Sequence, residues 1–366
     1  KDSTAAVWAA LSDPNKYVVF QPAPAVRVAI GEEFGMPIGT SSTGKLAAAL
    51  RRLGADKVFD VDFAADLTIM EEGTELIERI QNGGVLPMIT SCSPGWIKYC
   101  EHFHKDFIPN LSSCKSPNQM QGAVTKTYFA EKNGLDPKDI FVVSVMPCTA
   151  KKFEINRPEM GRDGYRDVDA NITTRELARM LRQASIDYVN LPDEKFDEIL
   201  GESSGAAVIF GVTGGVMEAA LRTVADVLNV LAQIEYTAVR GLDGIKEATV
   251  NIGGRDVKVA IVHGTGNANK LLNSIRNGER TYHFIEVMGC PGGCVTGGGQ
   301  PHVEARLRYE VDPREARAAA TYACDEAMTI RKSHQNPAIQ KIYAEYFGKP
   351  GSHKAHELLH TTYTER

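Results

Sequence analysis

Short apolar runs rich in β-branched residues alternate with longer stretches of helical periodicity along the whole chain. This alternation is typical of α/β proteins, in which helices cover the faces of a sheet. The short runs predict strands at residues 26–30, 85–90, 140–145, 207–210, 257–262 and 283–287. The periodic stretches predict helices at residues 45–53, 118–131, 174–183, 215–228 and 267–276, and Thr173 or Thr174 is placed to cap the third of these helices.

Two glycine-containing segments resemble nucleotide-binding loops in spacing, but each lacks residues that such a loop requires. The segment GTSSTGKL, residues 39–46, has the spacing of a phosphate-binding loop, yet Leu46 stands where a hydroxyl is needed for magnesium, and the preceding GEEFGMP is not a strand. We expect a capped helix start there. The segment FGVTGGVMEAALR, residues 210–222, reads as a strand that turns into a helix and lacks the lysine. Its glycines are expected to permit close packing beside a site.

The composition describes a globular protein of 366 residues with 43% hydrophobic content, long enough for two lobes. The net charge of -5, without a run of like charges, excludes an obvious nucleic-acid or membrane-surface partner. No apolar run approaches the ~20 residues of a membrane span, and the opening KDSTAAVWAAL does not read as a signal peptide. We therefore expect a soluble, cytoplasmic protein, and the start at Lys1 indicates a piece of a longer chain.

Seven cysteines are too few for a disulfide framework in a chain of this length, and the odd number fits a reducing compartment with thiols free for metals. Three of them follow strand-like runs: Cys92 after GVLPMIT, Cys148 after IFVVSVMP and Cys290 after YHFIEVMG. Loops at the carboxyl ends of strands are where α/β proteins place their sites. Three further cysteines have neither a neighbouring glycine nor a second thiol and are expected to be small hydrophobic residues: Cys100, Cys114 and Cys324.

The run EVMGCPGGCVTGGGQP, residues 286–301, surrounds Cys290 and Cys294 with glycines, which let the backbone approach a bound object closely. Backbone N–H groups exposed in this way suit the sulfurs of an iron–sulfur cluster. Zinc stays the alternative, although no second cysteine pair accompanies the first. In MPCTAKKFE, Lys151 follows Cys148 by three residues, where its charge can stabilise a thiolate site or an anionic ligand.

The segments TSCSPGW, MPCTAKKFE and EVMGCPGGCVTGGGQP resemble, in order and separation, the three signature loops of the iron-only (FeFe) hydrogenases. NLSSCKSP, ITTRELARM, IFGVTGGVMEAALR, VRGLDGIKEA, RKSHQNP and KAHELLH are also similar to family sequence, so the resemblance covers essentially the whole chain. It implies an α/β fold of two lobes, each a small twisted sheet flanked by helices, with the active site in the cleft between them. Within one catalytic domain, residues 1–366, we expect lobes of roughly residues 1–95 plus C-terminal segments, and 96–285.

The resemblance also implies an H-cluster, which is a 4Fe-4S cubane bridged through a cysteine sulfur to a diiron unit with CO, cyanide and azadithiolate ligands. By position, Cys148, Cys290 and Cys294 match cubane ligands, and Cys294 matches the bridging one. Lys151 matches the residue that contacts a cyanide. The remaining positions that match the surroundings of the diiron unit are Ala23, Pro24, Pro117, Asn118, Met146, Phe210 and Met288.

In the family a relay carries protons between the surface and the cluster, and the matching positions here are Glu75, Ser112, Glu72 and Cys92. The two glutamates are three residues apart in a helical stretch and so share a face. Without the resemblance they would be interpreted as solvated surface acids. The resemblance thus assigns a catalytic role to an acidic pair that the sequence pattern alone would not single out.

Two departures from the family pattern affect these assignments. Many members have two adjacent cysteines in the first loop, where this chain has Cys92 and Ser93. Strict register makes Cys92 the relay residue and leaves Ser93 at the fourth cubane position, whereas the preference of iron–sulfur clusters for thiolate favours Cys92 as the fourth ligand and Ser93 as the proton carrier. We expect four thiolate ligands for the cubane, with Cys92 as the fourth. The second departure is Asn118, where the family commonly has glutamine.

The resemblance implies an enzyme that reversibly reduces protons to H2. No further CxxC set corresponds to the ferredoxin-like N-terminal domains of many members, so electrons are expected from a ferredoxin or from iron–sulfur clusters outside this sequence. Maturation proteins for the diiron unit and further hydrogenase subunits are expected partners. The alternatives are a hydrogen-sensing or electron-bifurcating subunit and, from another class, a hydrogenase-like iron–sulfur assembly protein without a diiron unit. A zinc-stabilised α/β domain would be colourless.

Overall fold

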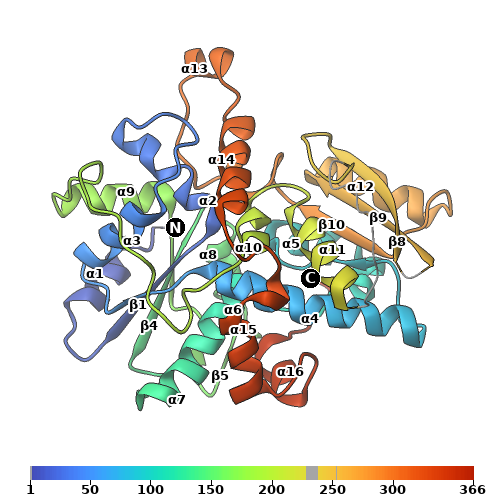
Figure 1. Cartoon of the computed structure of the whole chain (residues 1–366), viewed down its shortest axis with the longest axis horizontal. Coiled ribbons are helices and arrows are strands. Elements are labelled where there is room, and N and C mark those ends of the chain that lie inside the picture. The colour runs from blue at the N-terminus through green and yellow to red at the C-terminus, as the bar shows by residue number, and fades with distance from the viewer. Residues whose placement is uncertain (1, 228–237, 253) are drawn as a thin grey trace.

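The computed structural model describes residues 2–227, 238–252 and 254–366 and contains two four-stranded sheets (Figure 1). The first sheet has the order β2–β1–β4–β7, with β1 at Tyr17–Pro22, β2 at Lys57–Val58, β4 at Ile140–Met146 and β7 at Ala170–Thr173. The second has the order β3–β10–β9–β8, with β3 at Met88–Ile89, β8 at Ile245–Ile252, β9 at Arg255–His263 and β10 at Phe284–Met288. A short ribbon is formed by β5 (Gly161–Arg162) and β6 (Tyr165–Arg166).

The strand directions bring four loops toward one place. The first sheet is parallel throughout. In the second sheet β10 runs parallel to β3 and β9, while β8 pairs with β9 in the antiparallel sense. The loops that follow the carboxyl ends of β1, β3, β4 and β10 line a common cavity, so both sheets contribute to it.

Helices cover the sheets on both sides. They are α1 (Thr4–Ser12), α2 (Pro24–Arg27), α3 (Thr43–Arg52), α4 (Val61–Asn82), α5 (Pro94–Phe103), α6 (Pro117–Val124), α7 (Ala130–Asn133), α8 (Lys151–Glu154), α9 (Thr174–Gln183), α10 (Gly205–Val208), α11 (Gly215–Val227), α12 (Thr265–Arg276), α13 (Ala305–Glu310), α14 (Pro313–Ala327), α15 (Pro337–Ile342) and α16 (His353–Leu359). The 3₁₀ segments include η1 (Ile30–Phe34), η2 (Lys105–Asn110), η4 (Ile209–Gly211), η6 (Cys294–Thr296) and η7 (Ser333–Gln335). Two π-helical segments are η3 (Thr125–Phe129) and η8 (Tyr343–Phe347).

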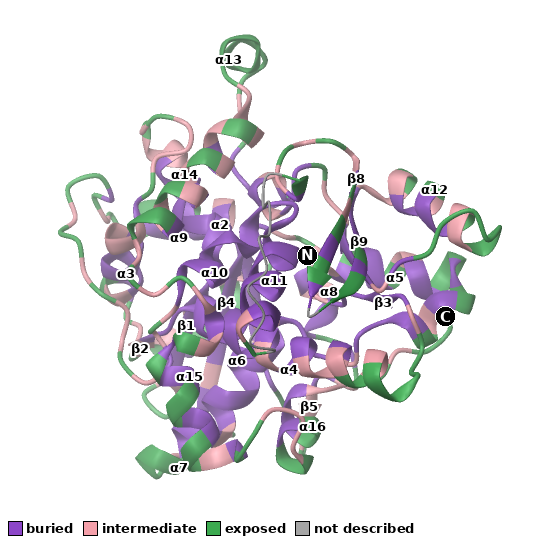
Figure 2. Cartoon of the chain, turned by 45° about the vertical axis from the view of Figure 1, so that its right-hand side comes forward, coloured by how far each residue is buried: buried purple, intermediate pink, exposed green. Residues whose placement is uncertain are grey.

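Alternating side chains along each sheet enter separate apolar clusters, which gives two helix–sheet–helix sandwiches. Val19 of β1 packs with α6 and the C-terminal helices, whereas Val18 packs with α3 and α9. In the second sheet Ile261 faces α4 and α11, and Val262 faces α5 and α12. Figure 2 shows these buried interiors meeting around α4, α10 and α11, so the middle of the molecule is the most enclosed part.

The helix α4 spans 22 residues and connects the cavity to the surface. The Asp60 carboxylate caps its start by accepting a hydrogen bond from the backbone N–H of Asp62, and Gly83 ends it with a φ of 70°. Its first half is almost wholly buried against α6, α10 and α11, while its last turns are more exposed. Side chains along this helix can therefore run from the interior to solvent.

Several predicted elements are confirmed. The strands at 140–145, 257–262 and 283–287 correspond to β4, β9 and β10, and the run at 85–90 contains the shorter β3. The helix at 174–183 is α9, and Thr173 caps it through a reciprocal capping box with Glu176. The helices at 45–53 and 267–276 correspond to α3 and α12, and 118–131 to α6, η3 and α7. The helix at 215–228 corresponds to α11, although residue 228 lies outside the described residues.

Two predicted strands are wrong. Residues 26–30 lie in α2 and the start of η1, and residues 207–210 lie in α10 and η4. Both runs are buried on all sides, so they lack the periodicity that separates a strand from a helix. Pro24 occupies the first helical position, where its fixed φ favours a helix. The segment at 210–222 accordingly passes from a 3₁₀ turn, not a strand, into α11.

The two sheets do not follow the expected division of the chain at residue 95. Strand β3 lies in the first part but pairs with β10, whereas β4 and β7 lie in the second part but pair with the sheet of β1. The chain therefore passes between the sheets several times. The predicted helix start at GTSSTGKL is confirmed as α3, although Ser42 makes no capping hydrogen bond with its side chain. Among the helices that the structure describes, none is long and apolar enough to cross a membrane.

Candidate active site

A largely apolar cavity lies where the loops of the two sheets meet. Protein atoms leave about 780 Å³ unfilled there, including the part that opens to solvent. It is lined by Ala23, Pro24, Ala25, Val61, Ala65, Cys92, Ser93, Pro94, Pro117, Asn118, Met146, Pro147, Cys148, Lys151, Phe210, Gly211, Met288, Gly289, Cys290, Gly293, Cys294 and Gly297. Every residue predicted to hold or surround the cluster is in this set.

Three thiols form a group at one side of the cavity. Cys148 follows β4, and Cys290 and Cys294 lie in the loop after β10. Burial, followed by the neighbouring Cys148 and Cys290, raises the pKa of Cys294 to about 12, because a buried thiolate is poorly solvated and adjacent thiolates repel. Burial likewise raises the pKa of Cys290, with Cys148 as the next cause. Thiolates so close together need a bound cation, which an iron–sulfur cluster provides.

The glycines of the loop after β10 allow this close approach. A Cβ on Gly297 would lie 2.3 Å from the backbone oxygen of Pro147, and one on Gly293 would lie 2.7 Å from the backbone nitrogen of Thr213. Gly293 also has a φ of 98°, which L side chains rarely adopt. The bare backbone is therefore required by the fold around the thiols, as the sequence suggested.

Cys92 and Ser93 are adjacent in sequence but have different surroundings. Burial raises the pKa of Cys92 well above its ordinary value, and the nearby Glu72 carboxylate adds to this effect more than any other charged group. The hydroxyl of Ser93 instead accepts a hydrogen bond of 3.1 Å from the backbone N–H of Gly289, beside Cys290. Cys92 thus lies close to the acidic residues of α4, and Ser93 lies against the loop that carries two of the grouped thiols.

Lys151 brings a buried positive charge to the cavity. Its ammonium group donates to both carboxylate oxygens of Glu154, at 2.8 and 3.0 Å, and to the backbone oxygen of Cys92 at 3.1 Å. The amide of Asn118 donates to Glu154 at 3.3 Å and accepts from the side-chain amide of Gln21 at 2.9 Å. Asn118, which stands where the resemblance expects a glutamine, is therefore held by hydrogen bonds to Gln21 and to Glu154, the partner of Lys151.

The remaining wall of the cavity is apolar. Ala23 and Pro24 come from the end of β1, Met146 and Met288 from the ends of β4 and β10, and Pro117 and Phe210 from α6 and η4. All of these side chains except that of Pro117 are nearly or fully buried, while Pro117 is partly exposed. The donor set, the glycine backbone and this dry wall together fit a cluster that combines thiolate ligation with a solvent-excluded metal unit.

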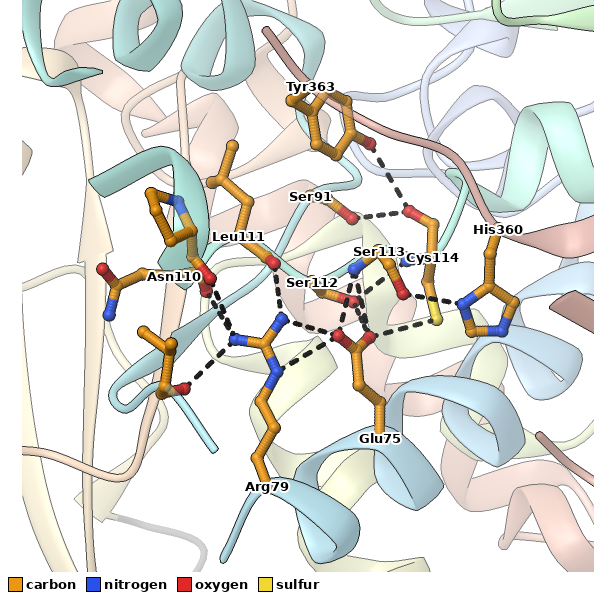
Figure 3. A network of polar contacts seen from close by, with 12 residues as sticks. Glu75, Arg79, Ser91, Asn110, Leu111, Ser112, Ser113, Cys114, His360 and Tyr363 are labelled. Carbon is orange, nitrogen blue, oxygen red and sulfur yellow. Dashed lines mark hydrogen bonds and ion pairs between the residues drawn. The ribbon is translucent and has the colours of Figure 1, made fainter. Parts of the chain in front are cut away.

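The acidic residues predicted for a relay extend away from the cavity. Glu72 is buried, and burial together with the neighbouring Glu75 raises its pKa to about 8. The Ser112 hydroxyl donates to Glu75 at 2.9 Å, and Ser112 also acts on Glu72, whose pKa it lowers against the effect of burial. Figure 3 shows Glu75 accepting from Arg79, and the Glu75 side chain is 14% exposed. The four predicted relay residues are therefore neighbours, and the interpretation of Glu72 as a solvated surface acid is wrong.

Three residues near the site were not predicted from the sequence. Glu154, the partner of Lys151, could have been predicted from the sequence, because it lies three residues after Lys151 on the same helix. Arg79 likewise follows Glu75 by four residues on α4. Glu286 is a buried carboxylate on β10 that accepts from the backbone N–H groups of Gly214 and Met217, and the only signal for it is a charge inside an apolar strand.

The other cysteines were expected to be small buried hydrophobic residues. Cys100 and Cys114 are fully buried, as small hydrophobic residues would be, although Cys114 lies beside Glu75 and His360. The prediction is wrong for Cys324, which is half-buried on α14 with its sulfur 3.3 Å from the hydroxyl of Ser41.

Comparison with protein families gives two matches along the chain. A model described as iron only hydrogenase large subunit, C-terminal domain, matches residues 16–298. A second, described as iron hydrogenase small subunit, matches residues 310–366. Together the two models account for most of the chain, with a short gap before α14.

Individual relatives agree with these models. Iron hydrogenase 1 of Clostridium pasteurianum is 53% identical over 97% of this chain, which spans 62% of that protein's length. The periplasmic Fe hydrogenase large subunit of Nitratidesulfovibrio vulgaris is 53% identical over 80% of the chain and 70% of its own length. Cytosolic iron-sulfur assembly component 3 of Rattus norvegicus is 31% identical over 95% of the chain and 74% of its length.

Solved structures show the same similarity. A variant of FeFe-hydrogenase HydA1 from Chlamydomonas reinhardtii superposes with a TM-score of 0.86 at 41% identity, covering 100% of this chain and 99% of that one. The arrangement of sheets and helices described above is therefore shared with that enzyme along its whole length.

Proposed function

The chain belongs to the iron-only hydrogenase family, and on that premise we propose that it is a catalytic domain for the reversible reduction of protons to H2. The observation that carries the proposal is a cavity that combines grouped thiols, a buried lysine and an acidic relay leading outward. Each of these features has a separate task in proton reduction, and a purely structural metal site would need only the thiols.

The residues present would hold an H-cluster in two parts. Cys148, Cys290 and Cys294 would ligate the 4Fe-4S cubane, with Cys294 as the bridge to the diiron unit that bears CO, cyanide and azadithiolate. Lys151 would hold an anionic ligand of that unit through its ammonium group. When bound, the cluster would pass on electrons from the external donor and supply the metal chemistry of the reaction. The apolar wall around it excludes water and competing ligands.

The fourth cubane position could be taken by Ser93, as strict register implies, or by Cys92, as a set of four thiolates implies. The surroundings of these two residues support Ser93. Ser93 lies against the loop of Cys290 through its hydrogen bond with Gly289, whereas Cys92 lies beside Glu72. We therefore propose that Cys92 carries protons and that Ser93 or a solvent ligand occupies the fourth position. An oxygen ligand there would bind iron less strongly than a thiolate.

The relay residues would move protons between the surface and the cavity. Glu75 is partly exposed and exchanges protons with solvent, the Ser112 hydroxyl joins it to Glu72, and Glu72 delivers the proton to the thiol of Cys92. The pKa of about 8 for Glu72 lets that carboxyl hold a proton at neutral pH and still release it.

The competing functions differ in what they require of the site. A hydrogen sensor or electron-bifurcating subunit would use the same cluster, and only its rate and redox partners would distinguish it. An iron–sulfur assembly protein would need the cubane thiols but neither the relay nor the lysine. The complete relay, and the higher identity to hydrogenases than to the assembly component, favour the hydrogenase.

Partners and surroundings are proposed on the same basis. A ferredoxin or another iron–sulfur carrier would supply electrons, maturation proteins would load the diiron unit, and further hydrogenase subunits would join the assembly. We keep the division into two lobes, with the cavity as the cleft between the two sheets, as a proposal. A cytoplasmic location also stays a prediction, because one relative of similar identity is named as periplasmic.

The test is infrared spectroscopy of the protein after anaerobic loading with the diiron cofactor, combined with H2 evolution from a reduced dye. Sharp CO and cyanide bands with H2 evolution would support the proposal. A protein that carries 4Fe-4S but shows no such bands would favour the assembly function, unless Ser93→Cys restores them. In that case the serine has weakened the site without changing its function.

A further inference from the structure

The outer end of the relay brings together three side chains of the types that bind transition metals. A carboxylate oxygen of Glu75, the sulfur of Cys114 and a ring nitrogen of His360 all lie within 4.8 Å of one another (Figure 3). They come from α4, from the loop after η2 and from the end of α16, and a β-bridge joins Cys114 to His360. The backbone therefore fixes two of the three positions.

His360 is oriented as metal-binding histidines usually are. Its Nε2 lies 3.0 Å from Glu71 Oε2, and Glu71 is held in turn by the hydroxyl of Tyr343 and the backbone N–H of Gly351. This arrangement directs Nδ1 toward Ser113, whose hydroxyl is 2.8 Å away. A carboxylate behind the distal ring nitrogen fixes the tautomer and makes the other nitrogen a better ligand.

The surroundings favour a cation. Cys114 is fully buried, and its sulfur lies 3.9 Å from Glu75 Oε2. Burial raises the pKa of its thiol well above the ordinary value, and Glu75, Glu72 and Glu71 add to that effect in this order. A bound metal ion would displace the thiol proton and reduce the repulsion among these groups. Arg79 pairs with Oε1 of Glu75, whereas Oε2, the oxygen nearer Cys114, accepts from the hydroxyl of Ser112 at 2.9 Å and the backbone N–H of Ser113 at 3.0 Å (Figure 3), so a metal ion would share this oxygen with two neutral donors.

We propose that Glu75, Cys114 and His360 bind a divalent transition metal of the Zn²⁺ type, separate from the cysteine cavity. One sulfur, one nitrogen and one carboxylate oxygen with an open fourth position suit Zn²⁺, while Mg²⁺ and Ca²⁺ prefer oxygen ligands alone. Tetrahedral bonds to zinc require a sulfur–oxygen separation of roughly 3.6 Å, so the observed 3.9 Å needs only a small shift. His360 would exchange its contact with Ser113 for the metal.

Occupation of this site would inhibit turnover, a consequence that rests on the proposed function. Glu75 is the outermost carboxylate of the proposed relay, and a metal ion on it would remove the group that exchanges protons with solvent. The site would therefore act as an inhibitory metal site that leaves the cluster intact. Its effect would be reversed by a chelator that removes the metal.

The experiment adds Zn²⁺ to the cluster-loaded protein, in which the cavity thiols are already occupied, and measures bound zinc after gel filtration. Zinc-edge X-ray absorption reports the neighbours of the metal. We expect one zinc per chain with one sulfur neighbour. Binding should be weakened at least about ten-fold by Cys114→Ser or His360→Gln. The matched control is Cys324→Ser, a lone cysteine far from the relay, which should bind zinc as the natural protein does, and Mg²⁺ should not compete.

Absence of retained zinc, or equal binding in the Cys114→Ser and His360→Gln variants, would overturn the proposal. If zinc binds as expected but H2 evolution continues at the same rate, the metal site stands and Glu75 is not an obligatory proton carrier. If the protein evolves no H2 even without zinc, the proposed function fails while the binding measurements still decide on the site.

Discussion

Glu72 and Glu75 lie one helical turn apart on α4, yet their replacement should change stability in opposite directions. Glu72 is buried with a pKa raised to about 8, so below that pH the folded protein holds it protonated, whereas the unfolded chain releases the proton near pH 4.5. A raised folded pKa means that the stability contribution is complete below about pH 4.5 and is lost as the pH rises toward 8. Glu72→Gln cannot ionise and should escape that loss.

The magnitude follows from the two pKa values. Each unit of pH between them costs about 1.4 kcal/mol, so the ionisable carboxyl costs about 3 kcal/mol at pH 7 and about 1 kcal/mol at pH 5. For 366 residues the entropy of unfolding is roughly 0.8 kcal/mol per kelvin, and Glu72→Gln should melt about 4 °C higher than the natural protein at pH 7. Glu75→Gln loses the ion pair with Arg79 and should melt lower, by about 1–3 °C.

The assay is thermal unfolding of the two variants and the natural apoprotein, under reducing conditions, at pH 5, 6 and 7. Both variants should also slow H2 evolution after cluster loading, on the order of 10²-fold or more, because each interrupts the relay. A melting temperature for Glu72→Gln equal to that of the natural protein at pH 7, or a difference that does not grow from pH 5 to pH 7, would refute the reasoning about Glu72. A stabilised variant that turned over normally would refute its place in the relay.

Three further changes test a buried ion pair, a close backbone approach and a helix cap. Lys151→Met leaves the carboxylate of Glu154 buried without its cation and should cost about 3 kcal/mol in unfolding free energy, most of which adding Glu154→Gln should return. Gly297→Ala places a methyl group 2.3 Å from a backbone oxygen and should reduce the iron bound per chain, while Gly298→Ala, with 3.4 Å of space, should retain it. Thr173→Ala removes the capping box of α9 and should cost about 1 kcal/mol, measured by denaturant unfolding.

The sequence predicted the site better than it predicted the elements that carry it. Motif spacing placed Cys148 and Cys290 at strand ends, and the structure confirms both positions because the carboxyl ends of parallel strands meet at one edge. The runs at 26–30 and 207–210 were misassigned because a segment enclosed on all sides has no polar face to reveal its period. Burial itself, decided by long-range packing, was the missing information.

The charged residues near the cavity show a second limit. Glu72 reads as a surface acid because its neighbours on α4 include several acids, and its burial depends on tertiary packing that brings distant residues such as Ser112 and Cys92 beside it. Glu286 was missed for the same reason, since its partners are backbone N–H groups from a distant part of the chain. Residue types indicate which chemistry is possible, while depth and partners, which determine the pKa, depend on the tertiary fold.

Helix α13 projects from the molecule (Figure 1). It lies between the part of the chain that forms the sheets and the C-terminal part that contains α14, α15 and α16. It has no buried residue, and Tyr309 near its end is 93% exposed. One family model stops before it, at residue 298, and the other starts at its last residue, 310. The following segment is held by buried ion pairs, such as Arg317 with Glu32 and Asp325 with Arg222. These side-chain contacts, rather than the peptide connection through α13, hold the C-terminal segment against the rest of the protein. The same architecture could therefore be encoded as one chain or as two.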